Sequence, residues 1–327
     1  MNVFLFGATG FVGKNLIPEL LEAGYDVTAL VRRSSKHGNL VSDHKVKVVT
    51  GDITDSTSYK THLCSTGYVV NLAGVVTDWA PKSDYYRVHV EGLKKLLDAC
   101  ADAEIKKFVH ISTAGVMQRE NKNAPLNEMT AVSKSRSPYI RSKSIGETLV
   151  LSYAQYFEVV ILRPSWIYGT GDKVLLPELA RQIKGGKMVI VGGKDIYLPL
   201  VHVKNFCDAI ILALRKPSVN KEVFIISDGE KTWKELFDQI ADSIDAVRPS
   251  TVLPYFVAYA VGFVMEVIWK VFRLKGRPLL TRTAAEMLGK TVRLDTSKAE
   301  KVLLYRPQIG LDAGIQEVIH YLHDTDI

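Results

Sequence analysis

The sequence is poor in cysteine and has no cluster of metal-binding side chains. Its 327 residues include three cysteines, Cys64, Cys100 and Cys207, which are widely spaced and have no ligand group near them. An odd number at such spacing excludes a disulfide framework and a structural zinc site. We therefore predict reduced, mostly buried thiols and no metal.

The sequence also lacks repeats, low-complexity segments and nucleic-acid-binding motifs. Lys and Arg outnumber Asp and Glu by 42 to 35, for a formal net charge of +7, but the basic residues are scattered. Nucleic-acid binding needs a concentrated basic surface on a recognisable motif, so no such partner is predicted. An apolar run begins at residue 2, where a signal or transit peptide would require its own segment, and we expect a cytoplasmic location.

The longest apolar segment is 253–272, which is interrupted only by Pro254, Gly262, Glu266 and Lys270. Its length approaches that of a membrane span. However, it carries a charge in its last two turns and basic residues follow it, which suits a helix at an interface or above an apolar pocket. Three interpretations stay open: a buried helix of a substrate lobe, a peripheral membrane contact, and a true span.

Strands and helices alternate from the start of the chain. Short apolar runs recur up to residue 162 and are separated by helical stretches such as 84–100. This alternation predicts a doubly wound parallel sheet, the α/β Rossmann arrangement. We predict a dinucleotide-binding domain at 1–165, with returning segments at about 196–228. A smaller, mostly helical substrate lobe would comprise 166–195 and 229–327.

Three glycines lie between the first strand and the first helix. Glycine permits a tight turn, close approach of a phosphate, and close packing of helix on strand, while the helix N-terminus offers free N–H groups. The turn therefore predicts a pyrophosphate site. Its residues are Gly7, Thr9, Gly10, Phe11, Val12 and Gly13.

The end of the second strand indicates which dinucleotide binds. An acidic residue there would hydrogen-bond the ribose of NAD, but Arg32 and Arg33 follow Val31 instead. Guanidinium groups suit a 2′-phosphate. We therefore predict that NADP is preferred, with NAD possible, and that Arg32 contacts the phosphate.

Tyr139 and Lys143 are one helical turn apart in a segment that reads as a helix over 135–156. An ammonium group and a cationic nicotinamide both favour the phenolate, so this tyrosine is predicted to exchange a proton with a substrate hydroxyl near neutral pH. Ser112 and Thr113 follow a buried strand, which places their hydroxyls at the carboxyl edge of the sheet, where ligands bind.

With these motifs the chain resembles an extended short-chain dehydrogenase/reductase of the NAD-dependent epimerase/dehydratase superfamily. The segments 51–53, 71–74 and 162–169 resemble the family's adenine-side acid, its loop beside the cofactor, and its turn near the nicotinamide. The resemblance implies that Thr113 polarises the substrate oxygen, Tyr139 is the acid/base and Lys143 binds the nicotinamide ribose. The further cofactor contacts that it implies are Asp52, Ile53, Leu72, Ala73, Gly74 and Pro164. His89 departs from the family, where many relatives have asparagine, so no amide contribution is expected from that position.

Within this family, segments 110–116, 228–237 and 253–259 resemble the 3β-hydroxysteroid dehydrogenase and sterol-4α-carboxylate 3-dehydrogenase branch. The resemblance implies hydride transfer to or from an alcohol or ketone on a hydrophobic, sterol-like substrate, and a homodimer. Candidate substrate contacts are Thr77, Trp79, Trp166 and Tyr197, although aromatic residues of this kind are more often packing residues.

Two other functions stay open. A sugar-nucleotide epimerase or reductase would use the same residues and would need a diphosphate pocket, which Arg277, Arg282 and Arg293 could supply. The second alternative is a non-catalytic redox sensor that binds NADP, and the presence of Thr113, Tyr139 and Lys143 argues against it.

Overall fold

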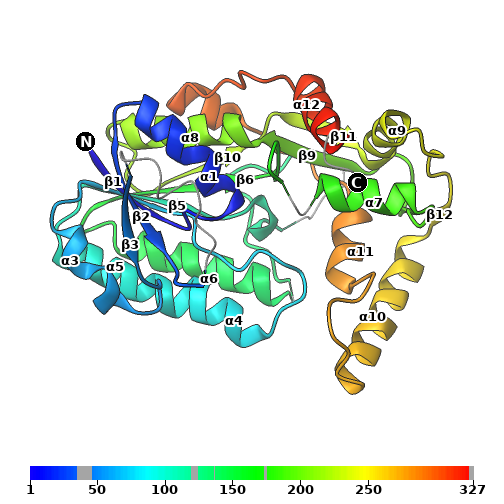
Figure 1. Ribbon diagram of the computed structural model, residues 1–327, viewed down its shortest axis with the longest axis horizontal. Helices are drawn as coiled ribbons and strands as arrows, with labels where there is room; N and C mark the ends of the chain where they lie inside the picture. The colour runs from blue at the N-terminus through cyan, green and yellow to red at the C-terminus, as the bar shows by residue number, and fades with distance from the viewer. Residues whose placement is uncertain (35–45, 119–123, 136, 173–174, 324–327) are drawn as a thin grey trace.

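The protein is described from a computed structural model, which covers residues 1–34, 46–118, 124–135, 137–172 and 175–323. Its centre is a seven-stranded parallel sheet (Figure 1). The strands are β1 Asn2–Phe6, β2 Asp26–Val31, β3 Val46–Thr50, β4 Tyr68–Asn71, β5 Lys107–Ile111, β6 Glu158–Pro164 and β10 Glu222–Ile226. Their order is β10-β6-β5-β4-β1-β2-β3, which confirms the predicted doubly wound arrangement. Such strands are buried on both faces, so they read as continuous apolar runs.

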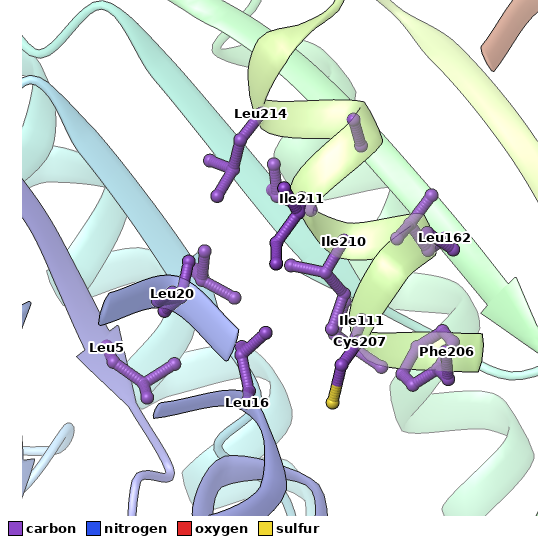
Figure 2. Close-up of a cluster of buried hydrophobic side chains, with 14 of the residues drawn as sticks. Leu5, Leu16, Leu20, Ile111, Leu162, Phe206, Cys207, Ile210, Ile211 and Leu214 are labelled. Atoms are coloured by element: carbon purple, nitrogen blue, oxygen red, sulfur yellow. The ribbon is translucent and has the colours of Figure 1, made fainter. Parts of the chain in front are cut away.

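Helices cover both faces of this sheet (Figure 1). One face carries α1 (Phe11–Glu22) and α8 (Val203–Arg215), whose side chains form one apolar cluster with β1, β5 and β6. Figure 2 shows Leu16 and Leu20 of α1 beside Ile210 of α8 in this cluster. The other face carries α3 Lys60–Leu63, α5 Leu93–Asp102 and α6 Pro138–Ser152, with a short helical turn at η1 Ser56–Ser58. A second turn, η3 Ala114–Val116, follows β5 and belongs to a separate small apolar cluster.

The C-terminal part is mostly helical, as expected. It contains a three-stranded sheet and a strand pair, namely β7 Trp166–Tyr168, β9 Tyr197–His202 and β11 Gly229–Thr232, and β8 Ile190–Val191 with β12 Val252–Leu253. Its helices are α7 Leu176–Lys184, α9 Trp233–Ser243, α10 Tyr255–Val271, α11 Arg282–Leu288 and α12 Leu311–His323, with a π-helical turn at η4 Ala299–Leu303. The domain limits at 165 and 228 stay a prediction.

Two helices differ from their expected bounds. The helix expected over 135–156 is α6, which begins at Pro138 because proline suits the first helical position, and which ends at Ser152. The helix expected over 84–100 runs from α4 (Lys82–Tyr86) through a π-helical turn, η2 (Arg87–Gly92), into α5. Single π-helical turns within helices are frequent at functional sites, and η2 carries His89.

Helix α10 and the shorter α11 form a hairpin that extends from one end of the molecule (Figure 1). In the part of the chain that the structure describes, no helix reaches the length and hydropathy that a membrane span requires. A helix buried in the lobe is also the wrong description, because only Ala258, Gly262 and Glu266 of α10 are buried.

Candidate active site

The turn after β1 is built so closely that only glycine fits at two of its positions. Gly7 has φ +86°, and a Cβ on it would lie 2.7 Å from the carbonyl carbon of Leu72. A Cβ on Gly13 would lie 2.4 Å from Gly7 O, so the first turn of α1 packs directly against the loop. The Gly10 N–H donates to Gly7 O over 3.0 Å, which closes the turn.

The N-terminus of α1 suits an anion. Its N-cap, Gly10, has no side chain to bond the first N–H groups, and no acidic residue lies in the first turn. These N–H groups and the positive end of the helix dipole are therefore available to a pyrophosphate. A Cβ at exposed Gly10 would meet only Gly7 O, at 3.2 Å, so the approach to the backbone is open. This turn fits the dinucleotide that the sequence predicts, with Thr9, Phe11 and Val12 part-exposed around it.

Arg32 and Asp52 lie near each other at the ends of β2 and β3. Burial raises the pKa of Asp52, but hydrogen bonds from Thr54 and the charges of Arg32 and Arg87 outweigh it and hold that pKa below its usual value. Asp52 is thus an anion whose Oδ1 accepts from the N–H and the hydroxyl of Thr54, at 2.9 and 2.7 Å. Arg32 is exposed, and Ile53 beside Asp52 is buried.

The loop after β4 connects the glycine turn to α6. Asn71 Oδ1 accepts from the Ala73 N–H at 3.1 Å and shapes the loop. Leu72 and Ala73 touch Gly7 at one end of it, while at the other end a Cβ on Gly74 would lie 3.6 Å from Lys143 Nζ. Two motifs that are more than a hundred residues apart in the sequence therefore share one loop.

The Thr113 hydroxyl lies close enough to the Tyr139 phenol to favour its ionised form. Thr113 Oγ1 accepts from the Gly115 N–H at 3.2 Å, and its own hydroxyl proton stays available as a donor. Burial raises the pKa of Tyr139 to about 12, and the neighbouring Thr113 hydroxyl lowers it only in part. Desolvation therefore dominates in the protein alone. The expected proton exchange near neutral pH, which also relies on the charge of a bound nicotinamide, stays a prediction.

Lys143 lies one turn further along α6, as predicted, and is buried. Its Nζ donates to Ile111 O at 2.9 Å, at the carboxyl end of β5. Burial lowers the pKa of Lys143 to about 8, while the negative charge of Glu147 works in the opposite direction. The lysine is therefore poised to change charge close to physiological pH.

His89 holds α6 and the loop after β4 together. Its Nε2 accepts from the Val75 N–H at 2.9 Å, so the ring proton is on Nδ1, which donates to Ser142 Oγ at 2.8 Å. Ser142 Oγ in turn donates to Tyr139 O at 2.9 Å. Burial, followed by the charge of Lys143, lowers the pKa of His89 to about 3. A neutral histidine thus performs a backbone-binding role that the sequence did not assign to it.

A buried ion pair, also not foreseen from the sequence, supports the far side of α6. Arg163 of β6 binds Glu147 with two parallel hydrogen bonds, Nε to Oε1 at 2.9 Å and NH2 to Oε2 at 2.7 Å. The only sequence signal for it was a charged residue within the apolar strand that precedes Pro164. Pro164, a predicted cofactor contact, is buried at the end of that strand and pairs in register with Ile226.

The predicted substrate contacts are spread over two regions. Thr77 and Trp79 lie in the loop after β4, where Thr77 O accepts from the Tyr85 hydroxyl and Lys270 of α10 lies 5.6 Å from the Trp79 ring centroid. The described contacts of Trp166 and Tyr197 are within the C-terminal part, with Trp233 and Arg293 respectively. Among the described residues no group of three or more metal-binding side chains comes together.

The sequence of the chain matches the NAD-dependent epimerase/dehydratase family over residues 3–227, and the chain belongs to that family. It is an enzyme of this class of NAD-dependent oxidoreductases and epimerases.

Two similar proteins have names that specify a reaction. A sterol-4-alpha-carboxylate 3-dehydrogenase, decarboxylating, from Dictyostelium discoideum is 30% identical, over 97% of this chain and 99% of that protein. A 2-alkyl-3-oxoalkanoate reductase from Shewanella oneidensis is 26% identical, over 97% of this chain and 85% of that protein.

The fold has close structural neighbours. A dTDP-glucose 4,6-dehydratase from Streptomyces venezuelae, solved with NAD bound, has a TM-score of 0.81 and 23% identity, over 99% of this chain and 97% of that one. At this identity the likeness shows the fold alone.

Proposed function

We propose that this enzyme transfers a hydride between a nicotinamide dinucleotide, with NADP preferred, and an alcohol or ketone on a hydrophobic substrate. The observation that carries the proposal is the grouping of Thr113, Tyr139 and Lys143 at the carboxyl end of β5, connected by one loop to the glycine turn. Ligands of doubly wound folds bind at this edge of the sheet.

Each residue has a separate task. Thr113, which lies beside Tyr139, holds the substrate oxygen, and the Tyr139 phenol gives a proton to a substrate ketone or takes one from a substrate alcohol. Lys143 provides a cation beside the ribose position and favours the phenolate, and His89 with Ser142 fixes the backbone of α6. When bound, the dinucleotide supplies or accepts the hydride at its nicotinamide ring. Its positive charge in the oxidised form adds to the stabilisation of the phenolate.

The two relatives' names support one class of substrate. A 3-oxoalkanoate with a 2-alkyl group and a sterol oxidised at C3 beside a C4 carboxylate both have their reacting oxygen on the carbon β to a carboxylate. Both also have a hydrocarbon substituent at the carbon between. We therefore propose an α-alkyl, β-hydroxy or β-oxo carboxylate with a large apolar body as the substrate class.

The decisive test measures NADPH oxidation by the purified chain with a long-chain 2-alkyl-3-oxo acid, and NADP reduction with the matching β-hydroxy acid. Tyr139→Phe should retain NADPH binding, measured by fluorescence titration, and lose activity by about 10²–10⁴-fold because the proton donor is removed. Retained turnover in this variant would refute the role of Tyr139. Absence of turnover in the wild-type protein, with NADPH bound, would refute the substrate class.

The preference for NADP rests on Arg32. Replacing Arg32 by Ala removes the exposed guanidinium but leaves Asp52 bonded to Thr54, so the turn after β3 keeps its hydrogen bonds. We expect KM for NADPH to rise at least tenfold while KM for NADH changes less than twofold. Equal effects on the two cofactors would show that Arg32 does not read the 2′-phosphate.

Sugar-nucleotide epimerisation is less well supported. The three arginines that could bind a diphosphate are each close to a carboxylate: Arg277 to Asp78 at 3.5 Å, Arg282 to Glu266 at 2.7 Å and Arg293 to Glu230 at 3.1 Å. A diphosphate would have to displace these partners.

A further inference from the structure

Helix α10 is fixed in one orientation by a narrow buried stripe. Ala258, Gly262 and Glu266 are four residues apart and face α11. A Cβ on Gly262 would lie 2.8 Å from the backbone of Thr281, so the two segments are in direct contact. Glu266 accepts three hydrogen bonds from Arg282: from its backbone N–H at 2.8 Å, from Nε at 3.0 Å and from NH2 at 2.7 Å. The face that α10 turns outward is thus set by specific contacts.

That outward face is apolar. Phe256 is 72% exposed, Val264 53% and Val271 68%, and the neighbouring Val261, Phe263 and Val267 are also exposed. Over 255–271 the only charged residues are Glu266, which is buried, and Lys270, which lies at the border of this face. A helix that faces water normally carries its polar residues outward, and contiguous apolar surface of this kind marks an interaction site.

The tip of the hairpin is basic. Arg273 and Lys275 are exposed and directly follow the apolar face, and the sequence has no acidic residue between Glu266 and Glu286. An exposed apolar helix face with flanking basic side chains suits insertion among lipid headgroups, where the apolar side chains reach the acyl boundary and the cations meet phosphate.

We infer that the hairpin of α10 and α11 docks on an anionic phospholipid bilayer. A second copy of the chain is a poorer partner because it carries the same positive tip, and pairing hairpin with hairpin would gather like charges. An anionic headgroup layer neutralises that tip, and the chain as a whole has a formal charge of +7.

The hairpin also contacts the loop after β4. Thr281 Oγ1 donates to Asp78 Oδ2 at 2.7 Å, Arg277 lies 3.5 Å from Asp78, and Lys270 covers the Trp79 ring. The bilayer-facing element therefore adjoins the loop that also touches Gly7 and Lys143. If the proposed function holds, docking brings the mouth of the active site to the lipid surface, from which an apolar substrate would enter.

The test is co-sedimentation of the full chain with vesicles of phosphatidylcholine alone and of equal parts phosphatidylcholine and phosphatidylglycerol. We expect binding to the anionic vesicles at least tenfold tighter than to the neutral ones, and weaker as salt is added. Absence of binding to both kinds of vesicle would overturn the inference. The assay needs no turnover, so a protein that binds vesicles but is inactive would refute the proposed function and leave the docking intact.

Two variants separate the apolar and electrostatic contributions. Val264→Glu with Val267→Glu should weaken binding to anionic vesicles at least tenfold, because it places two carboxylates on the inserted face. Arg273→Gln with Lys275→Gln should weaken it roughly tenfold, with little effect on neutral vesicles. The control is Val247→Glu, a more exposed valine (89%) outside the hairpin, which should bind as the wild type does.

Sedimentation velocity without lipid tests the alternative that a second copy of the chain covers the apolar face of α10. A hairpin that docks on lipid leaves the oligomeric state of Val264→Glu/Val267→Glu the same as that of the wild type. If this variant instead converts a dimer to a monomer, the apolar face is a contact between copies, and the inference falls. Vesicle binding by this variant equal to that of the wild type would overturn it as well.

Discussion

Helices α6 and α10 place their polar and apolar groups in opposite ways. Helix α6 buries two charged residues, Lys143 and Glu147, whereas α10 exposes Phe256, Val264 and other apolar side chains. The buried charges of α6 are tolerated because each has a partner, Ile111 O for Lys143 and Arg163 for Glu147. Within the described residues nothing covers the outward face of α10. Burial in α6 follows the partners that its charged groups contact, and for the outward face of α10 the partner that we propose lies outside the chain.

The largest difference in stability between the two helices should appear when the arginine of each Arg–carboxylate pair is replaced. Arg163→Met leaves Glu147 buried without its cation, and we expect a loss of about 3–5 kcal/mol in the free energy of unfolding. Arg282→Met should lose only about 1–2 kcal/mol, because the Arg282 side chain is 35% exposed and Glu266 keeps the backbone N–H of residue 282. Urea denaturation measures both.

A control makes this comparison specific. Arg163→Met combined with Glu147→Met should recover most of the lost stability, because no unpaired charge is then buried. An Arg282→Met loss as large as that of Arg163→Met would mean that the two helices do not differ in the way described.

Of the two helices, the α6 side rather than the hairpin should contribute histidines to acid instability, because the sequence of the hairpin has no histidine. Burial lowers the pKa of His89 to about 3 and that of His110 well below its usual value. Between about pH 6.5 and the folded-state pKa, the unfolded chain therefore binds more protons than the folded one. Stability must then fall as the pH falls through that window, by up to about 1.4 kcal/mol per pH unit for each histidine.

Replacing His89 by Asn removes one of these titrating groups. Between pH 6 and 4 we expect the slope of unfolding free energy against pH to decrease by about 1 kcal/mol per unit, whatever the variant's stability at pH 7. Thermal melts across this range give the slope. An unchanged slope would show that His89 is protonated in the folded protein, and its acceptor role toward Val75 would be wrong.

The sequence was sufficient to predict the sheet and the grouping around Tyr139. Motifs at the carboxyl ends of parallel strands meet at one edge of the sheet, and Gly7, Gly74 and Thr113 follow β1, β4 and β5, which are neighbours in it. The spacing of Tyr139 and Lys143 needed only helical geometry. Both inferences depend on local sequence patterns and on the alternation of strands and helices, which the sequence displays directly.

Other features depend on packing between distant segments. The pairing of His89 with Ser142 and that of Glu147 with Arg163 arise where η2 and β6 lie against α6, and no spacing rule gives either contact. The pKa of Tyr139 depends on how much water the fold removes, which the sequence does not state. The sequence also did not predict which face of α10 is exposed, because the apolar run has no helical period and the buried stripe contains glycine and glutamate.

The smallest change in stability is expected when the same substitution, Val to Thr, is made on each of the two helices. Val150 of α6 is fully buried in the apolar cluster below the sheet, so Val150→Thr buries an unsatisfied hydroxyl and should reduce the free energy of unfolding by about 1–3 kcal/mol. Val264→Thr on the outward face of α10 should stay within about 0.5 kcal/mol of the wild type, because that side chain is already in water. Chemical denaturation of both variants, at protein concentrations low enough to prevent association, decides the matter. Equal losses would mean that the face of α10 is packed in the folded chain, and then neither its exposure nor its docking on lipid could stand.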